Sequence, residues 1–405
     1  MELTHWERAS SWALPNRVAY LLAAGVIGLG LFASVTPSPL YHVYATGWHF
    51  EPETLTLIYA TYAFGALATL LLAGRVSDEV GRRPVLLAAL GLLMASTILF
   101  IFAESAAWLF VARGLQGLAT GAAISTAGAA LLDLHPRHDG AAVSLANGVA
   151  SAAGISLGIL VSSAIVQLGH APRTLPYVVL FTLFAIAFVG SYLMPEPVTE
   201  RRGFRLTIER PKVPAEVRRP FVLAALAVLS SWSIGGLFFS LGPELGVRLF
   251  DTTNVVVAAI GIVALAGSAA LAQLLLGRIA PWVGASAGSL ALAAGTALIV
   301  TSAALTSSTI YLAGSILGSI GFGIAFLGGL RALVASIPPH HRAAVLSAFY
   351  VVAYASLSIP AVLAGIVVSH VSLDTTFESF GSVVAAIALV VSFEAWRTRP
   401  ARSYA

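Results

Sequence analysis

The feature that most constrains this chain is a series of long apolar runs that contain almost no charge. The runs LIYATYAFGALATLLLA and VLLAALGLLMASTILFIFA, for example, hold no Asp, Glu, Lys or Arg. A run of about 20 apolar residues crosses the hydrocarbon core of a bilayer, where only helices and closed barrels satisfy their own backbone groups. The runs predict an all-α membrane protein with twelve membrane-spanning helices: 17–44, 53–73, 85–103, 106–132, 141–168, 174–194, 220–243, 253–276, 284–304, 309–335, 343–369 and 376–396.

The composition argues against several other classes of protein. Only 10% of the residues are charged, whereas a soluble domain has about 25%. The chain has no cysteine, which excludes disulfides, iron–sulfur clusters and thiolate–zinc sites, and we expect neither a metal nor a cofactor. No Walker-type phosphate loop occurs, and no apolar run carries a Ser/His, paired-Asp or H-E-x-x-H arrangement. We therefore expect neither an ATP-driven pump nor an intramembrane enzyme.

The basic residues predict the orientation of the chain in the membrane. If the N-terminus is cytoplasmic, 19 of the 22 Lys and Arg residues fall on the inner side, and only Arg173 and Arg248 fall in outer loops. This skew follows the positive-inside rule and places both termini in the cytoplasm of a cell membrane, such as a bacterial inner membrane. The N-terminal segment MELTHWERASSWALPNR is too polar for a signal peptide, so we expect a retained first helix. The net charge of +4 then reflects topology and does not indicate nucleic-acid binding.

An internal repeat divides the chain. LLAGRVSDEVG ends the second run and LLLGRIAPWVG ends the eighth, and HPRHDGAAVSL after the fourth run matches PPHHRAAVLSA after the tenth. Both matches are offset by about 203 residues. We predict two pseudo-symmetric six-helix halves, 1–194 and 220–405, joined by a cytoplasmic linker, 195–219, that is rich in proline and charge.

The stretch GRVSDEVGRRP concentrates charge between the second and third runs. Its second-half copy retains the glycines as Gly277 and Gly284, whereas Asp78 corresponds to Pro281 and Arg82 to Ala285. We interpret the glycines as requirements of a tight turn. The charges must then serve a purpose that is specific to the first half.

Three motifs resemble the major facilitator superfamily of secondary transporters. GRVSDEVGRRP resembles the family's motif between helices two and three, LFVARGLQGLATGAA resembles the helix-four motif of its twelve-helix drug:proton antiporters, and GLGLFASVTPSPLY resembles their helix-one pattern. The fifth run lacks these exporters' Gly-Pro pair, and the first run lacks the acid that several of them carry. The matching residues are Gly74, Asp78, Gly81, Arg82 and Arg83 in the first motif, Arg113, Gln116, Gly117 and Gly121 in the second, and Gly28, Pro37 and Pro39 in the third.

The resemblance implies alternating access, with a substrate bound at the midplane between two six-helix halves. It also implies that the charged stretch is a conformational latch, which contacts the start of the eleventh helix near Arg342 and Ala343. Asp78 and Arg82 are four residues apart and can pair if the turn is helical. The alternative is a surface ion pair of little consequence.

Arg113 is the only ionisable residue well inside a first-half run, and Gln116 shares its helix face. Intramembrane arginines usually mark a pathway, and arginine keeps its proton. Arg113 could stabilise a neighbouring carboxylate in proton coupling, hold an anionic group, or serve only packing. The candidate proton carriers are Asp133 and Glu244, which both lie at the ends of runs and could equally be interfacial charges.

Aromatic residues predict the substrate cavity. Lipid-facing positions are the alternative for each of them: Tyr41, Tyr59, Tyr62, Trp232, Phe322, Phe326, Tyr350 and Tyr354. Small residues form a stripe in the fifth run, Asn147, Ser151, Gly154 and Gly158, and indicate close helix packing. Pro37, Pro39 and Pro360 predict bends or ends of helices.

Together these features predict a monomeric transporter for a small-molecule substrate in the lipid bilayer. The first hypothesis is proton-coupled efflux of small lipophilic or neutral organic compounds. The alternatives are a uniporter or importer of a sugar or organic anion and, from another class, a membrane receptor.

Overall fold

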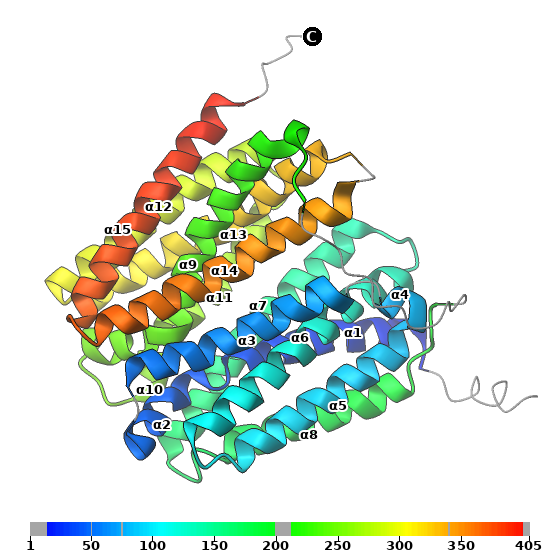
Figure 1. The fold of residues 1–405 in the computed structure, drawn as a ribbon, viewed down its shortest axis with the longest axis horizontal. Coiled ribbons are helices and arrows are strands. Elements are labelled where there is room, and N and C mark those ends of the chain that lie inside the picture. The colour runs from blue at the N-terminus through cyan, green and yellow to red at the C-terminus, as the bar shows by residue number, and fades with distance from the viewer. Residues whose placement is uncertain (1–13, 50, 74–75, 199–211, 339–340, 400–405) are drawn as a thin grey trace, which may run out of the picture.

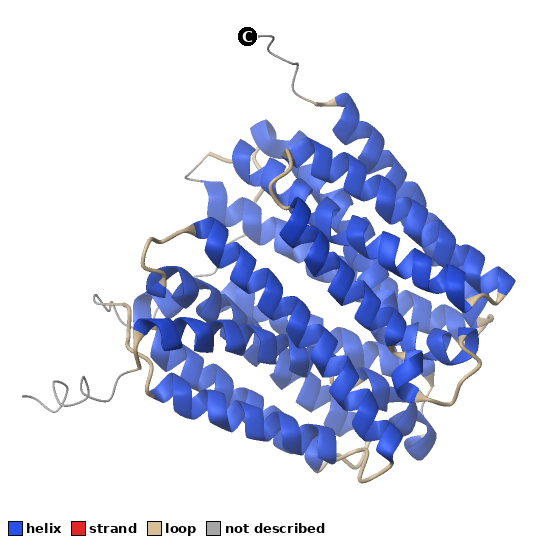
Figure 2. Cartoon of the chain, turned by 180° about the vertical axis from the view of Figure 1, so that it is seen from behind, coloured by secondary structure: helices blue, strands red, loops and turns tan. Residues whose placement is uncertain are grey.

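The computed structural model describes residues 14–49, 51–73, 76–198, 212–338 and 341–399, and all the regular secondary structure in these ranges is helical (Figures 1 and 2). The twelve predicted membrane helices are confirmed: eleven helices are long and apolar enough to cross a membrane, and a shorter one, α11, completes the set. The first half comprises α1 (Asn16–Val35), η2 (Ser38–Leu40), α2 (Tyr41–Trp48), α3 (Pro52–Ala73), α4 (Val76–Val80), α5 (Arg82–Ile101), α6 (Ala106–Leu134), α7 (Gly140–Leu168) and α8 (Leu175–Tyr192).

The second half has six corresponding spans but no counterpart of α4 among its described residues. It comprises η3 (Ala215–Val217), α9 (Arg218–Leu249), α10 (Val255–Ala258), α11 (Ile260–Leu276), α12 (Pro281–Leu305), α13 (Ser308–Ser336), α14 (Arg342–Val368) and α15 (Leu373–Arg397). The predicted linker includes residues 199–211, which lie outside the described residues. The division of the chain at 195–219 therefore stays a prediction.

Prolines shape two of the spans in different ways. The first span breaks after Val35, and the chain continues through a 3₁₀ turn that begins after Pro37. Proline has no N–H and clashes with the preceding turn, which ends or kinks a helix. Pro360, in contrast, lies within the continuous helix α14.

Small residues allow neighbouring helices to approach closely. A Cβ on Gly158 of α7 would lie 2.9 Å from the Cα of Phe32 in α1, and a Cβ on Gly314 of α13 would lie 2.9 Å from the backbone nitrogen of Ile299 in α12. Gly158 of the fifth span is therefore a packing position, as the spacing of the small residues predicts, and Gly314 of the tenth span is another.

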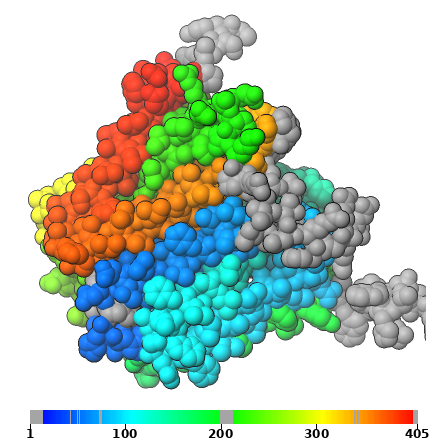
Figure 3. All heavy atoms as spheres, viewed as in Figure 1, coloured from blue at the N-terminus to red at the C-terminus, as the bar shows by residue number. Residues whose placement is uncertain are grey.

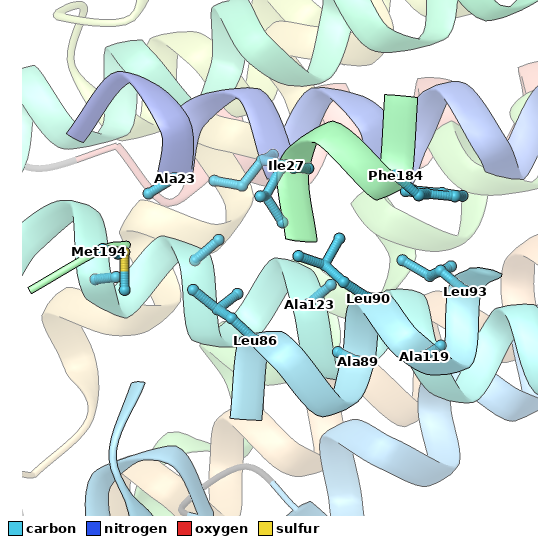
Figure 4. Close-up of a cluster of buried hydrophobic side chains, with 14 of the residues drawn as sticks. Ala23, Ile27, Leu86, Ala89, Leu90, Leu93, Ala119, Ala123, Phe184 and Met194 are labelled. Atoms are coloured by element: carbon cyan, nitrogen blue, oxygen red, sulfur yellow. The ribbon is translucent and has the colours of Figure 1, made fainter. Parts of the chain in front are cut away.

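A continuous apolar core fills the first half. Ala23 and Ile27 of α1 pack with Leu90 of α5, Phe184 of α8 and the fully buried Met194 (Figure 4). This packing extends to the end of the bundle that carries α4 and the start of α5. We call this end the charged end, and it lies toward the upper right in Figure 1.

The two halves meet along two helix pairs, α3 with α14 and α7 with α11. In the space-filling view the orange α14 lies directly against the blue α3 (Figure 3). These contacts frame the space between the halves, where the family resemblance predicts the substrate.

Candidate functional site

A central cavity of about 330 Å³ lies between the halves, at the level of the middle of α13 and α14. It is lined by α1, α3 and α7 of the first half and by α9, α11, α13 and α14 of the second. Six of the eight predicted aromatic residues line it: Tyr59, Tyr62, Trp232, Phe322, Phe326 and Tyr354. Tyr41 and Tyr350 are not among the lining residues.

The cavity wall is aromatic and uncharged. Among the described residues no Asp, Glu, Lys or Arg lines it. Trp232 packs with Phe326 and Tyr354, with ring centroids 5.7 and 5.5 Å apart. Two amides, Asn147 of α7 and Gln273 of α11, supply polar groups from opposite halves. Such a site suits an apolar solute that carries one or two hydrogen-bonding groups.

The cavity reaches furthest toward the charged end. Its lining includes Asn147, near the start of α7, and Gln273, near the end of α11. At the far end the halves are in contact instead. Thr56 of α3 is fully buried against Gly365 of α14, and Gln167 of α7 accepts a hydrogen bond from the backbone N–H of Val255 at 2.8 Å. The molecule is thus closed at the far end.

Arg113 of α6 lies immediately behind the cavity wall. It is fully buried, and its guanidinium lies 4.8 Å from the ring centroid of Tyr62 and 5.8 Å from that of Tyr59. Its Nη1 donates to the Ser34 carbonyl at 2.8 Å, while Nε and Nη2 have no hydrogen-bond partner among the described residues. The Tyr41 hydroxyl is also close to this guanidinium. The structure therefore holds a buried cation among tyrosines, with two guanidinium nitrogens that make no hydrogen bond to the described residues.

Gln116 stabilises the break in the first span. Its Oε1 accepts from Arg113 Nη1 at 2.7 Å, and its Nε2 donates to the Ala33 carbonyl at 3.0 Å. That carbonyl would bond to the N–H four residues later in an unbroken helix, but Pro37 has none. The Arg113–Gln116 pair therefore satisfies carbonyls that the proline turn leaves exposed.

Arg82 is the centre of a charged network at the charged end. Its guanidinium pairs with Asp78, contacts Asp133 Oδ2 at 2.9 Å and donates to Ser77 Oγ at 2.8 Å. Asp78 and Arg82 thus form the ion pair that the sequence predicts, although not within one helical turn: Asp78 lies in α4, Arg82 begins α5, and the turn at Gly81 separates the two helices. Arg83 lies over the ring of Tyr192, 4.8 Å from its centroid. The network joins α4, α5, α6 and α8.

A sequence profile described as Major Facilitator Superfamily matches residues 20–359. The chain belongs to this superfamily. Members of the superfamily are transporters, so the chain is a multi-pass membrane transporter and not an enzyme.

Curated relatives match only one part of this superfamily transporter. The Multidrug resistance protein MdtL of Escherichia coli O45:K1 is 34% identical over 96 residues, which is 24% of this chain and 25% of the relative. The same protein from E. coli O139:H28 is 33% identical over 96 residues, with the same coverage. The chain spans about a quarter of the length of the curated relatives it matches.

Solved structures share the fold at low identity. The xylose transporter XylE from E. coli, in a partially occluded inward-open conformation, has a TM-score of 0.75 at 14% identity and covers 95% of this chain and 98% of that one. The human organic anion transporter MFSD10 (TETRAN) has a TM-score of 0.67 at 17% identity and covers 94% of this chain and 100% of that one. These likenesses establish the major facilitator fold.

Glu196 is a member of the charged network that we did not predict from the sequence. Its carboxylate accepts the backbone N–H groups of Arg82 at 2.9 Å and Arg83 at 3.0 Å, at the start of α5. A carboxylate is favourable there because the first amides of a helix have no partner within it. The repeat offers one sequence signal for Glu196. The 203-residue offset pairs it with Arg399, so this acid, like Asp78, occurs in the first half only.

The glycines that the two repeats share have different roles. Gly81 has φ of 116°, a value that favours glycine, and precedes α5 as expected for a turn. Gly284 instead lies within α12, where a Cβ would be 3.2 Å from the Cα of Gly328. The interpretation of the shared glycines as turn residues is therefore wrong for Gly284.

The remaining predicted site residues lie apart from the cavity. Glu244 is exposed near the end of α9 at the far end of the bundle, and Tyr350 packs against Phe349. Gly74 lies outside the described residues, and the side chains of Arg342 and Ala343, the expected latch partners, are also outside them.

Proposed function

We propose that this transporter exports small, neutral or lipophilic organic compounds by alternating access between two six-helix halves. The observation that carries the proposal is the central cavity, whose described lining is aromatic and small and holds amides but no charge. An anionic or cationic substrate would lose its hydration there without a compensating ion pair. The partial likeness to the multidrug resistance protein MdtL supports the direction of transport.

Protons are the proposed coupling ion, and the helix-four motif around Arg113 is the support for this choice. Arg113 forms no ion pair among the described residues. In this proposal Arg113 holds the tyrosine-rich wall in place. Its positive charge stabilises the negative charge of a carboxylate or hydroxide that approaches it during turnover. Asp133 and Glu244 stay candidate carriers. We place the monomer in a bacterial inner membrane with both termini cytoplasmic, so that the cavity faces the cytoplasm in this state.

Counterflow exchange in proteoliposomes tests the substrate class. A panel of labelled solutes should include a neutral lipophilic compound, a monosaccharide and an organic anion. We expect exchange of the neutral compound, and Trp232→Ala should raise its half-saturation concentration about tenfold through the lost aromatic contact. Exchange of only the monosaccharide would contradict the proposal.

Organic-anion transport is the second candidate, because Arg113 has two donors that nothing described occupies. Arg113→Met separates the cases. If Arg113 serves coupling, proton-driven accumulation is lost while exchange of neutral solute persists. If it binds substrate, anion exchange is lost as well, with normal folded yield. Arg137→Gln, an exposed arginine at the charged end, is the matched control and should leave both activities unchanged.

A further inference from the structure

A second hollow, of about 950 Å³, lies within the second half at its charged end, away from the central cavity. The starts of α9 and α12 and the ends of α13 and α15 line it. Figure 3 shows the red end of α15 beside the green start of α9 at this end of the molecule. No proposed step of transport uses this hollow.

The internal repeat shows which first-half residues correspond to the lining of the hollow. The 203-residue offset pairs Ala285 with Arg82 and Arg397 with Met194. In the first half Arg82 is only 8% exposed and Met194 is fully buried, so both side chains fill the space. In the second half a small Ala285 lines the hollow, and Arg397 is exposed at its rim. The position that the first half fills with an ion-paired arginine and a methionine is therefore open here.

The lining of the hollow is amphiphilic. Val222, Leu223 and Leu226 of α9 form an apolar wall, and Trp282 of α12 also lines the hollow. Basic residues occupy the rim, and Glu394 pairs with one of them, Arg397, at 3.0 Å. Arg218 and Arg219 are exposed and form no ion pair among the described residues. The rim therefore carries two arginines that make no ion pair with a described acid.

The surroundings of the hollow are basic as well. The charged residues of the described segments 212–220, 277–282 and 394–399 are Lys212, Arg218, Arg219, Arg278, Arg397 and Arg399 against Glu216 and Glu394. Basic pockets between helices at the cytoplasmic side of a membrane attract anionic lipid headgroups, and tryptophan is enriched at the interface.

We propose that this hollow binds one anionic phospholipid from the leaflet at the charged end. Arg218 and Arg219 bind the phosphate, because the guanidinium fork matches phosphate oxygens. An acyl chain lies along Val222, Leu223 and Leu226. The apolar wall favours a lipid over a soluble anion, because a soluble anion has no acyl chain to bury against it. The proposal is independent of the transported substrate.

Native mass spectrometry of the delipidated full-length protein tests the proposal. The probes are a phosphatidylglycerol, a phosphatidylcholine with the same acyl chains, and glycerol 3-phosphate as the soluble headgroup. We expect one phosphatidylglycerol to bind more tightly than phosphatidylcholine and glycerol 3-phosphate not to displace it. The R218Q/R219Q double variant should weaken binding of the first phosphatidylglycerol about twenty-five-fold, at about fivefold per arginine.

Two further variants control for charge and for folding. R17Q/R137Q removes the same net charge from exposed residues of the first half, which do not line the hollow, and should change binding less than twofold. Val222→Trp fills the hollow at an exposed position without a change in charge and should also abolish the preferred binding. Each variant should unfold at the wild-type temperature.

Three results would overturn the proposal. The first is equal weakening by the two charge-matched double variants, which would indicate a diffuse electrostatic effect. The second is displacement of phosphatidylglycerol by glycerol 3-phosphate, which would indicate a soluble anion site. The third is lipid binding that appears only after deletion of residues 400–405, which would assign the hollow to the chain's own C-terminus.

Discussion

A single methyl group at Gly365 would test whether the contact between α3 and α14 holds the far end closed. A Cβ at this position would lie 2.8 Å from the Cβ of Thr56, below the distance that real Cβ contacts show. Thr56 is fully buried, and its hydroxyl donates to the Glu53 carbonyl at 3.0 Å, so the side chain has little freedom to move away. Overpacking of this kind costs about 1–3 kcal/mol.

The cost falls on one conformation only, because Gly365 and Thr56 belong to different halves. In the alternate state, in which the far end opens, the two residues separate and the added methyl group has space. Gly365→Ala should therefore shift the equilibrium toward the state open at the far end by about 5-fold to 150-fold.

Single-cysteine labelling measures this shift, because the chain has no cysteine of its own. A cysteine at Ser38, which is 3% exposed in η2 near the far end, should react with a water-soluble maleimide at least fivefold faster in Gly365→Ala. A cysteine at Ser151 in the cavity wall should react more slowly. Adding Thr56→Ala removes the obstructing side chain and should restore both rates.

Two outcomes would refute the reasoning. One is unchanged labelling of both reporters in a Gly365→Ala protein that unfolds at the wild-type temperature. The other is a double variant with Thr56→Ala that retains the altered rates, because the effect would then arise elsewhere in the helix pair.

Three further predictions concern the charged end and the topology. Glu196→Ala should lower the free energy of unfolding by about 1–2 kcal/mol through the lost cap of α5, and Glu196→Gln by less, as measured by denaturant titration in mixed micelles. The Asp133 side chain is 32% exposed and the Asp78 side chain is 55% exposed. Asp133→Asn should therefore lower the free energy of unfolding by about 1.5 kcal/mol, and Asp78→Asn by at most about 1 kcal/mol. A larger loss for Asp78→Asn than for Asp133→Asn would contradict the network. A cysteine at Glu104 should react with an impermeant reagent in intact cells and one at Ser286 should not, and the opposite pattern would reject the predicted orientation.

The helices could be predicted from the sequence because the bilayer leaves few alternatives. A long uncharged run must form hydrogen bonds within itself, and the predicted spans match the helices closely, including the break near Pro37. Pro360 does not end α14, so the alternative of a bend at this residue stays a prediction.

The partners in the site could be predicted only in part. Arg82 and Asp78 are four residues apart, so the sequence predicts their pairing, but the pair forms across the turn at Gly81 and not along one helix. Asp133 comes from the end of α6 and Glu196 from the segment that follows α8, and their contact with Arg82 depends on where these distant parts of the chain lie at the charged end. Six of the predicted aromatic residues line the cavity, and residue type alone identified them. Tyr41 lies beside Arg113 instead, and the periodicity of the sequence does not reveal that contact.

The burial of Arg113 also has an electrical consequence. Arginine keeps its proton, so this side chain carries a full positive charge wherever α6 moves. A unit charge that crosses the whole membrane field exchanges about 2.3 kcal/mol per 100 mV, and a rocking motion that carries Arg113 through one tenth of the field exchanges about a tenth of that. The balance between the two states of the empty transporter therefore depends on the membrane voltage, and a negative interior favours the state in which Arg113 lies nearer the cytoplasm.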